Sequence, residues 1–368
     1  MKRRDFIKIA GISAALLPVA PSVFGTQAVQ TIPLRTHSYR LTYQVHLPEE
    51  GKKARLWLPL PDTDDTPHQF TQGSVWSGNA DIAKFENIPG TSSPMFHAEW
   101  RGTGPRHVMV SSVVKTTDRF VDWRNYPDKI SAALPADAKR FLRATKHIPT
   151  DGIVRKTALS IVKNANAKTP LQKAQAIYDW VVDNSYRDPA VRGCGRGDIK
   201  SMLESGNLGG KCADLNALFV GLARAAGVPA RDHYGIRIDD SASHKSLGQA
   251  GDITNAQHCR AEFYLAGLGW VPVDPADVHE LALEEELPIT NPRVVALREK
   301  LFGAWEMNWV AFNHARDVIL ARDSAIGELS FFMYPEAEIA GKKRDSLDPA
   351  EFSYQIVSSE LVGTGVKF

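Results

Sequence analysis

Cysteine is scarce in this sequence, whose 368 residues contain only Cys194, Cys212 and Cys259. So few cysteines exclude a small domain held together by a disulfide framework. Long apolar runs are also missing, because no stretch reaches the ~20 residues that a membrane-spanning helix needs. No group of His, Cys, Asp or Glu residues has the spacing of metal ligands, so the sequence predicts no metal ion and no cofactor.

Excess charge is lacking once the first 28 residues are set apart. The whole chain has a net charge of +2, and residues 1–28 alone have a net charge of +3. The remainder of the chain therefore has a net charge of about −1. No basic run or basic patch interleaved with aromatic residues follows, which argues against nucleic acid as a partner. Low-complexity tracts and internal repeats are absent as well. The remaining residues are therefore expected to form one large or two smaller globular domains.

Residues 1–28 have the features of an export signal. Arg3 and Arg4 precede a short apolar run, Ile9–Ala20, and small residues follow up to Ala28. This order is typical of a twin-arginine signal peptide. We expect the twin-arginine machinery to export the folded chain, which would then be periplasmic or secreted. The alternative is a basic cytoplasmic tail.

The most informative stretch is Gly209–Arg231, which reads GGKCADLNALFVGLARAAGVPAR. Its large apolar residues recur at helical spacing, and Gly227 and Pro229 provide a helix stop. Cys212 therefore lies at the first turn of a helix with one buried face. Free backbone N–H groups and the helix dipole favour the thiolate there, and the thiolate is the nucleophile. The alternative for this stretch alone is a small buried core cysteine.

A second stretch supplies partners for this cysteine. In QHCRAEFYL, apolar and polar residues alternate, which predicts a strand with His258 on its polar face. A glycine-containing turn follows, and a return strand, Trp270–Asp274, ends at Pro275. A cysteine on a helix, a histidine on a strand and an aspartate on the next strand form the set of nucleophile, base and orienting carboxylate.

The motifs GGKCADLNALF, QHCRAEFY and GWVPVDPAD, in this order, resemble the transglutaminase-like superfamily, which is related to papain-type thiol proteases. The resemblance is strong over residues 171–277. It implies an α+β fold in which the cysteine helix packs on an antiparallel sheet. By the same resemblance, Cys212 matches the nucleophile, His258 the general base and Asp274 the carboxylate that holds the imidazole.

The register of the hairpin decides whether Asp274 can reach His258. If Leu265 opposed Trp270, Asp274 would face away from the histidine. A three-residue loop, Ala266–Leu268, instead pairs Leu265 with Gly269 and brings Asp274 to the correct face. Such a loop favours a glycine in the left-handed region. We therefore predict this register or an equivalent bulge.

Further site residues are predicted with less support. The resemblance implies that the Cys212 N–H and a second donor upstream stabilise the oxyanion, for which Tyr186 is the best match and Trp180 the rival. The remaining substrate-binding candidates are Gln257, Gly210, Arg196 and Arg260. Arg196 belongs to the segment 185–199, which we expect to be a mobile loop beside the site. Its Gly-x-Gly-x-Gly run, 193–197, lacks the context of a phosphate-binding loop.

The cysteines leave three pairing options. Cys194 could bond with Cys259, which alternates with His258 and so is expected behind the site. A Cys194–Cys212 bond would inactivate the enzyme. In the third option no disulfide forms, and Cys259 is simply part of the core.

The domain prediction divides the chain into four parts. After the signal, 1–28, come a β-rich, sandwich-like domain, 29–130, a catalytic domain, 131–290, and a C-terminal extension, 291–368, with a helix and strands packed on the catalytic domain. The sequence predicts strands at 38–47, 54–60, 106–115, 305–312, 330–334 and 352–357. Helices are expected at 136–145, 151–164, 171–184 and 292–301. The segments 62–93 and 278–292 read as polar and loop-like.

The expected activity is thiol-dependent acyl transfer. We favour a cysteine peptidase or amidase that cleaves peptide, protein or other amide substrates in the cell envelope. A cross-linking enzyme of the protein-glutamine gamma-glutamyltransferase type shares every step up to the thioester and is the first alternative. A non-catalytic envelope-binding module is the second alternative, although all three triad residues are present.

Overall fold

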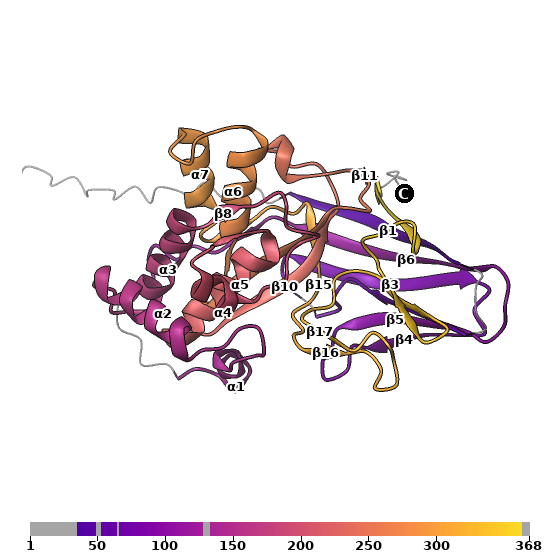
Figure 1. Ribbon diagram of the computed structural model, residues 1–368. Helices are drawn as coiled ribbons and strands as arrows, with labels where there is room; N and C mark the ends of the chain where they lie inside the picture. The colour runs from indigo at the N-terminus through magenta and orange to yellow at the C-terminus, as the bar shows by residue number, and fades with distance from the viewer. Residues whose placement is uncertain (1–34, 49–52, 65, 128–132, 363–368) are drawn as a thin grey trace, which may run out of the picture. The chain divides into compact units, whose positions relative to one another are not determined.

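The computed structural model describes residues 35–48, 53–64, 66–127 and 133–362 (Figure 1). All of them belong to one unit, Leu34–Phe368. The twin-arginine segment predicted at 1–28 lies outside the described residues. In the described part of the chain, no helix has the length and apolar character that crossing a membrane requires.

Two five-stranded antiparallel sheets make up the β-rich region. The first has the order β11 (Gly251–Asp252), β20 (Ser353–Glu360), β1 (Thr36–Leu47), β6 (Arg106–Thr117) and β3 (Gln69–Gly78). The second has the order β19 (Lys342–Arg344), β18 (Glu336–Ile339), β2 (Ala54–Pro59), β5 (Pro94–Trp100) and β4 (Ile82–Asn87). The Tyr43 hydroxyl on β1 donates to the Pro59 carbonyl on β2 at 2.9 Å and so links the two sheets.

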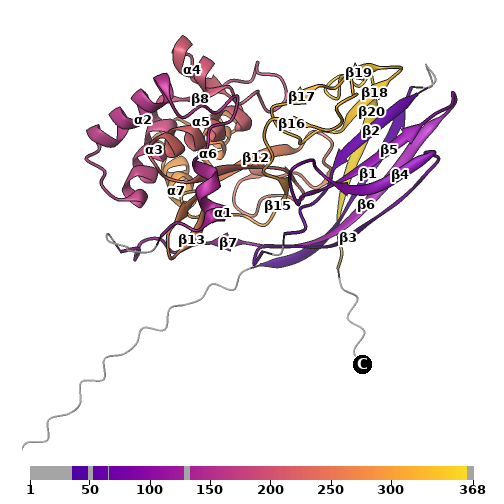
Figure 2. The same cartoon turned by 90° about the horizontal axis from the view of Figure 1, so that it is seen from below.

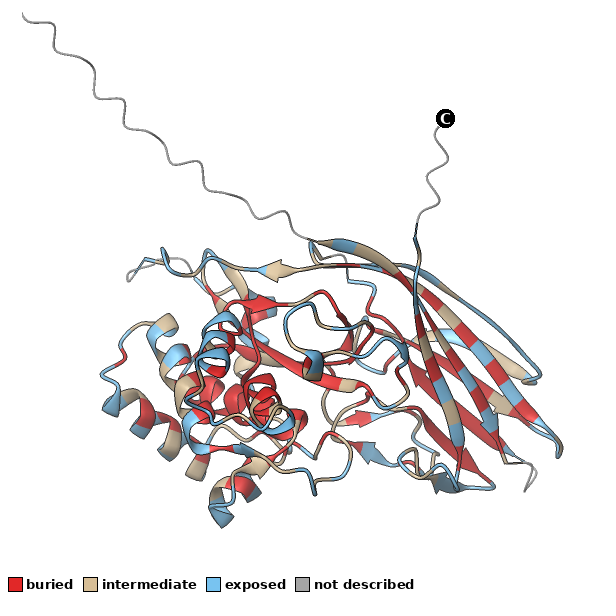
Figure 3. Ribbon diagram, turned by 90° about the horizontal axis from the view of Figure 1, so that it is seen from above, coloured by how far each residue is buried: buried red, intermediate tan, exposed pale blue. Residues whose placement is uncertain are grey.

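The strands of the first sheet bury one face, as their sequence alternation predicts. Along β1 and β6, buried residues alternate with more exposed ones, which Figure 3 shows as bands of red and pale colour. The buried side chains of β1, including Tyr39, Leu41 and Val45, join one apolar core with Leu56 of β2 and Phe96 of β5. This is the arrangement of a β-sandwich.

The segment 62–93 was predicted as polar and turn-rich, and this prediction is wrong in part because the segment contains β3 and β4. Both strands lie at the edge of a sheet, and most of their residues are exposed or only half-buried. Edge strands keep polar side chains, so they lack the apolar alternation that identifies a half-buried strand.

A four-stranded antiparallel sheet, which we call the catalytic sheet, carries the motifs that the sequence predicts to be catalytic. Its order is β13 (Gly269–Val273), β12 (Gln257–Leu265), β10 (Ala230–Arg237) and β15 (Trp309–Asn313). Figures 1 and 2 show the helices on one side of this sheet and the sandwich strands on the other. The principal helices are α2 (Gly152–Asn164), α3 (Pro170–Asn184), α5 (Cys212–Ala225), α6 (Pro275–Glu284) and α7 (Pro292–Lys300).

Short elements complete the described chain. The helical ones are α1 (Ala136–Lys139), η1 (Arg140–Leu142), α4 (Ile199–Ser205) and η2 (Lys245–Leu247). The two-stranded pairs are β7 (Arg119–Phe120) with β14 (Ala304–Trp305), β16 (Val318–Ile319) with β17 (Glu328–Leu329), and β8 (Tyr186–Arg187) with β9 (Gly209–Gly210). The β8–β9 pair is parallel and directly precedes the cysteine helix.

Helix α5 is buried on every side, since all 14 of its residues are buried. It packs against β10 and β12 and against α2, α3 and α6. This differs from the sequence prediction of a single buried face. Three polar residues interrupt the apolar pattern of the helix, yet they are buried too. These residues, Asp214, Asn216 and Arg224, each bond to a neighbouring segment, which allows their burial.

The C-terminal part of the chain supplies strands to all three large sheets. Strand β15 extends the catalytic sheet, whereas β18, β19 and β20 complete the sandwich. Two local predictions here are wrong. The segment 278–292 contains most of α6, whose start is marked by Pro275, and the predicted strand at 330–334 is absent among the described residues, where β18 begins only at Glu336. The predicted division at 130 and 290 remains a proposal.

Candidate active site

Cys212 occupies the first position of α5, at the edge of a cavity of about 370 Å³ that it lines together with Cys194 and His258. Lys211 is the N-cap, with extended backbone angles, so the chain turns into the helix immediately before the cysteine. At this position the Cys212 N–H has no acceptor inside the helix. The thiol therefore lies beside a free amide and the positive end of the helix dipole.

The β12–β13 hairpin has the predicted register. Leu265 pairs with Gly269 and Ala261 with Val273, and Gly267 has a φ of +82° in the connecting loop. Asp274 follows the last pair directly. The loop length therefore brings Asp274 to the face of the sheet that carries His258, as expected from the two-residue period of a strand.

Asp274 holds the His258 ring in a buried hydrogen bond. Its Oδ2 lies 2.8 Å from His258 Nε2, and both residues are at most 2% exposed. The other oxygen accepts from the Asp277 N–H at 3.2 Å and from Asn216 Nδ2 at 3.3 Å. Asp274 is thus also the N-cap of α6, and Asn216 on α5 connects it to the cysteine helix. His258 Nδ1 is the ring nitrogen that Asp274 does not bind.

A second carboxylate and an arginine complete the surroundings of His258, and the sequence reasoning missed both. Asp277 Oδ1 lies 3.2 Å from His258 Nε2 and 2.6 Å from Arg237 Nη2. The same Arg237 nitrogen is 3.4 Å from His258 Nδ1. The Asp-Pro-x-Asp pattern before α6 was a usable signal for Asp277, because Pro at N1 marks a helix start. Arg237 is distant in sequence and carried no local signal.

These charges favour an ion pair between cysteine and histidine. Burial and Arg237 disfavour the charged imidazolium, but the carboxylates of Asp277 and Asp274 outweigh them and raise the pKa of His258 to about 10. Burial also raises the pKa of the Cys212 thiol, yet hydrogen bonds from Cys194, Cys259 and His258 hold that pKa well below its usual range. Thiolate and imidazolium are therefore the favoured forms at neutral pH.

All three cysteines are free thiols, and all three are buried. Cys259 alternates with His258 along β12, as predicted, on the face of the sheet against which α5 packs. Cys194 Sγ lies 3.2 Å from the Gln257 carbonyl oxygen. The Cys259 side chain is fully buried and is not among the residues that line the Cys212 cavity.

The glycine-rich stretch 193–197 wraps around a carboxylate of the protein itself. The amides of Arg196 and Gly197 donate to Asp214 Oδ1 at 2.9 and 2.8 Å. Gly195 has a φ of +93°, and a Cβ there would lie 1.8 Å from Asp214 Oδ2. This backbone resembles an anion-binding nest whose ligand is a side chain. The stretch is thus fastened to α5 rather than free, contrary to the expected mobile loop.

Of the four substrate-binding candidates, Gln257 alone is among the residues that line the Cys212 cavity. Its amide nitrogen is bound to the Thr254 carbonyl oxygen at 3.0 Å. Gly210 packs against Asp214, where a Cβ would approach to 2.5 Å, and Arg196 lines a different cavity. Arg260 is 2% exposed, and its Nε lies 3.7 Å from Asp274 Oδ2. Its guanidinium stacks over the Trp309 ring. Arg260 is therefore placed to position Asp274 rather than to bind substrate.

The structure does not bring the two oxyanion candidates to the cavity. Tyr186 pairs with Gly209 and is 50% exposed, and its hydroxyl donates to Asn207 Oδ1 at 2.9 Å. Trp180 lies on α3 and lines a separate cavity between α2 and α3. Sequence distance to Cys212 could not show that the Tyr186 ring lies across Gly209, away from His258.

We expect Tyr186→Phe to change turnover less than twofold, because the hydroxyl that it removes binds an exposed asparagine and not a reacting group. The measurement is the steady-state rate of amide hydrolysis by the two proteins under identical conditions. Loss of an oxyanion donor typically costs about 10²–10³-fold. A fall of that size would restore Tyr186 as the second donor.

One group of potential metal ligands occurs among the described residues. His258, Asp274 and Asp277 offer ligand atoms within 4.8 Å of one another. Arg237 and Arg260 already neutralise these carboxylates, at 2.6 Å from Asp277 and 3.7 Å from Asp274. A divalent cation would be repelled by both guanidinium groups, so the group fits a histidine–carboxylate network better than a metal site.

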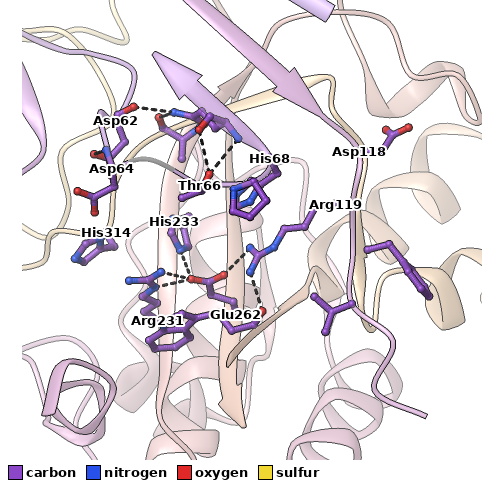
Figure 4. Close-up of a pocket in the computed structure, with 16 residues that line it drawn as sticks. Asp62, Asp64, Thr66, His68, Asp118, Arg119, Arg231, His233, Glu262 and His314 are labelled. Atoms are coloured by element: carbon purple, nitrogen blue, oxygen red, sulfur yellow. Dashed lines mark hydrogen bonds and ion pairs between the residues drawn. The ribbon is translucent and has the colours of Figure 1, made fainter. Parts of the chain in front are cut away.

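A second cavity of about 370 Å³ lies between residues 62–69 and the catalytic sheet. Figure 4 shows that Arg119, Arg231 and His233 converge on Glu262 at its floor. The three distances to the Glu262 carboxylate are 2.6, 2.5 and 2.7 Å. Burial would raise the pKa of Glu262, but these neighbours hold it well below its usual range. Through Arg119 the network links β7 to β10 and β12 of the catalytic sheet.

The comparison with known proteins agrees with this geometry. The profile of the transglutaminase-like superfamily matches residues 155–275, the stretch that carries Cys212, His258 and Asp274. An uncharacterised protein of Haemophilus influenzae is 38% identical over 342 residues, which cover 88% of this chain and 91% of that protein. The chain belongs to the transglutaminase-like superfamily. Its α+β fold, with a β-rich region and a cysteine helix packed on an antiparallel sheet, is as predicted.

Solved structures also resemble this transglutaminase-like chain. A Cytophaga hutchinsonii protein described as a candidate cysteine protease superposes with a TM-score of 0.53 at 14% identity, over 91% of this chain and 94% of its own. The periplasmic domain of TgpA from Pseudomonas aeruginosa has a TM-score of 0.34 at 17% identity, over 72% of this chain and 92% of the domain. The first likeness concerns the fold alone, and the second is too weak to support an argument.

Proposed function

We propose that this protein is a cysteine peptidase or amidase that cleaves amide bonds through a thioester, with Cys212, His258 and Asp274 as its triad. The observation that carries the proposal is the buried 2.8 Å bond between His258 Nε2 and Asp274, next to a cysteine at a helix N-terminus in the same cavity. The lowered pKa of Cys212 and the raised pKa of His258 support it. Such opposed shifts are typical of groups that act as nucleophile and acid.

The acylation step follows from these positions. The Cys212 thiolate attacks the carbonyl carbon of the substrate amide, and the oxyanion forms beside the Cys212 N–H. His258, protonated at Nδ1, gives its proton to the leaving nitrogen, so the C–N bond breaks and a thioester remains. Asp274 keeps Nε2 protonated throughout and stabilises the charge on the ring.

The second step releases the acyl group. Neutral His258 takes a proton from water as that water attacks the thioester carbonyl. The C–S bond then breaks, which releases the acid product and restores the Cys212 thiolate. A primary amine in place of water would give a new amide bond, which is the cross-linking alternative. The same triad serves both reactions, so the choice of acyl acceptor is a matter for experiment.

Export is part of the proposal. Residues 1–28 carry the twin-arginine pattern, and we infer that the substrates are peptides, proteins or other amides of the cell envelope in the periplasm or outside the cell. The free thiols of Cys194 and Cys259 are compatible with a chain that folds before export and needs no disulfide.

Alkylation of Cys212 by iodoacetamide tests the ion pair. At pH 6 we expect the native protein to react about 100-fold faster than His258→Ala, because a cysteine without its imidazolium returns towards the usual pKa and is mostly protonated. Mass spectrometry of the Cys212 peptide measures both rates. Equal, slow rates in the two proteins would contradict the proposal and favour a non-catalytic binding module.

The same preparation distinguishes water from amine as the acceptor. A mixed peptide library is incubated with and without a primary amine, and products are identified by mass. Free acids as the main products under both conditions are expected of a hydrolase. Amine adducts as the main products would instead establish the cross-linking alternative.

A further inference from the structure

The charged side chains that line the cavity holding Cys212 are mainly cations. Four cationic side chains face it, those of Arg187, Arg192, Lys211 and Arg237. Among the described residues that line this cavity, Glu280 supplies the one carboxylate. Such a lining favours a negatively charged group of the substrate and disfavours a positively charged one.

The arginines are fixed by carboxylates at their sides. Arg237 is 5% exposed and contacts Asp277 at 2.6 Å and Glu280 at 3.2 Å. Arg187 binds the same Glu280 at 3.1 Å. Arg237 Nη1 also donates to the Leu247 carbonyl oxygen at 2.8 Å, so both of its terminal nitrogens are already bonded within the protein. These contacts hold the two guanidinium groups in place, where their charge contributes to the potential at the cavity.

Lys211 differs from these arginines because no carboxylate of the described residues pairs with it. It precedes Cys212 directly and is the N-cap of α5. Its charge therefore adds to the positive end of the helix dipole. Lys211 lines the cavity without an ion pair to a carboxylate of the described residues, which suits a binding contact better than a structural one.

We propose that this cavity binds a carboxylate of the acyl substrate and that Lys211 determines the preference for it. This inference rests on the proposed function, because it concerns the substrate of the same cysteine. The chemical class is a peptide or related amide with a carboxylate close to the bond that is cleaved. Either an acidic side chain or the terminal carboxylate of a peptide supplies that group.

Two alkylating reagents of similar size and different charge test the cationic surface. Iodoacetate is an anion and iodoacetamide is neutral, so the ratio of their rates at Cys212 reports the local potential. The ratio also cancels changes in thiolate content, which affect both reagents equally. We expect the ratio for the native protein to exceed that for glutathione and to fall as ionic strength rises.

Lys211→Ala should lower this ratio about threefold or more, the effect of one charge a few ångströms from the reagent in a watery cavity. Lys211→Arg should retain it. The matched control is Lys200→Ala on α4, because Lys200 is 59% exposed and pairs only weakly with Glu204, at 3.8 Å. An unchanged ratio in Lys211→Ala, or an equal fall in Lys200→Ala, would overturn the inference.

These outcomes are separable from failure of the proposed function. If Cys212 reacted slowly with both reagents at pH 6, the ion pair itself would be disproved. Fast reaction with a ratio like that of glutathione would disprove the anion preference alone.

Protection of Cys212 from iodoacetamide identifies the source of the carboxylate. The probes are acetyl-Glu-Ala-amide, acetyl-Ala-Ala with a free terminal carboxylate, and neutral acetyl-Gln-Ala-amide. Stronger protection by the first than by the neutral peptide assigns an acidic side chain, and stronger protection by the second assigns a chain end. Protection by neither beyond that of the neutral peptide would contradict the inference.

Discussion

Replacing Cys212 with serine is expected to lower amide hydrolysis by at least about 10⁴-fold, because a hydroxyl at this position is not ionised near neutral pH. The two other cysteines provide matched controls. Cys194→Ala and Cys259→Ala each remove one hydrogen bond to the Cys212 thiolate, which is worth about 1–1.5 kcal/mol, or about tenfold. The measurement is release of primary amines from a mixed peptide library, followed with fluorescamine.

Folding of each variant is checked by thermal unfolding, because all three sulfurs are buried. A Cys212→Ser protein that unfolds at the parent temperature but has lost hydrolysis supports the nucleophile assignment. Equal losses in all three variants would instead indicate that the three cysteines together, rather than Cys212, are needed.

Glu262→Gln is expected to lower the free energy of unfolding at pH 7 by about 3–5 kcal/mol. The substitution leaves Arg119 and Arg231 partly buried without the carboxylate that both now contact, and breaking a buried ion pair from one side costs about this much. Urea unfolding measures the difference. The control is Glu204→Gln, an exposed residue of α4 whose change should stay within about 0.5 kcal/mol.

The pH dependence gives an independent check of the same network. The pKa of Glu262 is lower in the folded than in the unfolded chain, so its stabilisation is present above about pH 4.5 and is lost as pH falls below that value. In Glu262→Gln, the free energy of unfolding should therefore fall less steeply as the pH is lowered below about 4.5. A parent and a variant with the same acid limb would show that the network contributes little to folding.

The sequence predicted the elements that carry the candidate site wherever short-range patterns determine their geometry. A helix stop after Ala226, alternation around His258 and the length of one loop place Cys212, His258 and Asp274 correctly relative to their elements. Each of these features depends on neighbours within a few residues. The hairpin register in particular follows from one loop, Ala266–Leu268.

The parts that the sequence did not reveal depend on contacts between distant segments. Arg237 reaches His258 from the adjacent strand, and the Tyr186 ring turns away across Gly209. The periodicity of apolar and polar residues does not predict either side-chain orientation. The edge strands β3 and β4 were missed because most of their residues are exposed and lack apolar alternation. Helix α6 was missed because acidic residues interrupt its apolar pattern.

The pairing of β1 with β20 has a consequence for how the chain folds during synthesis. Tyr39 pairs with Glu360, and β2 pairs with β18, so each sandwich sheet combines strands from near both ends of the described chain. During synthesis, the edges of β1 and β2 that pair with β20 and β18 keep unpaired backbone groups until those last strands leave the ribosome. Contacts so distant in sequence slow folding and leave edges exposed to aggregation. A chaperone that shields the emerging N-terminal strands should therefore increase the yield of folded protein.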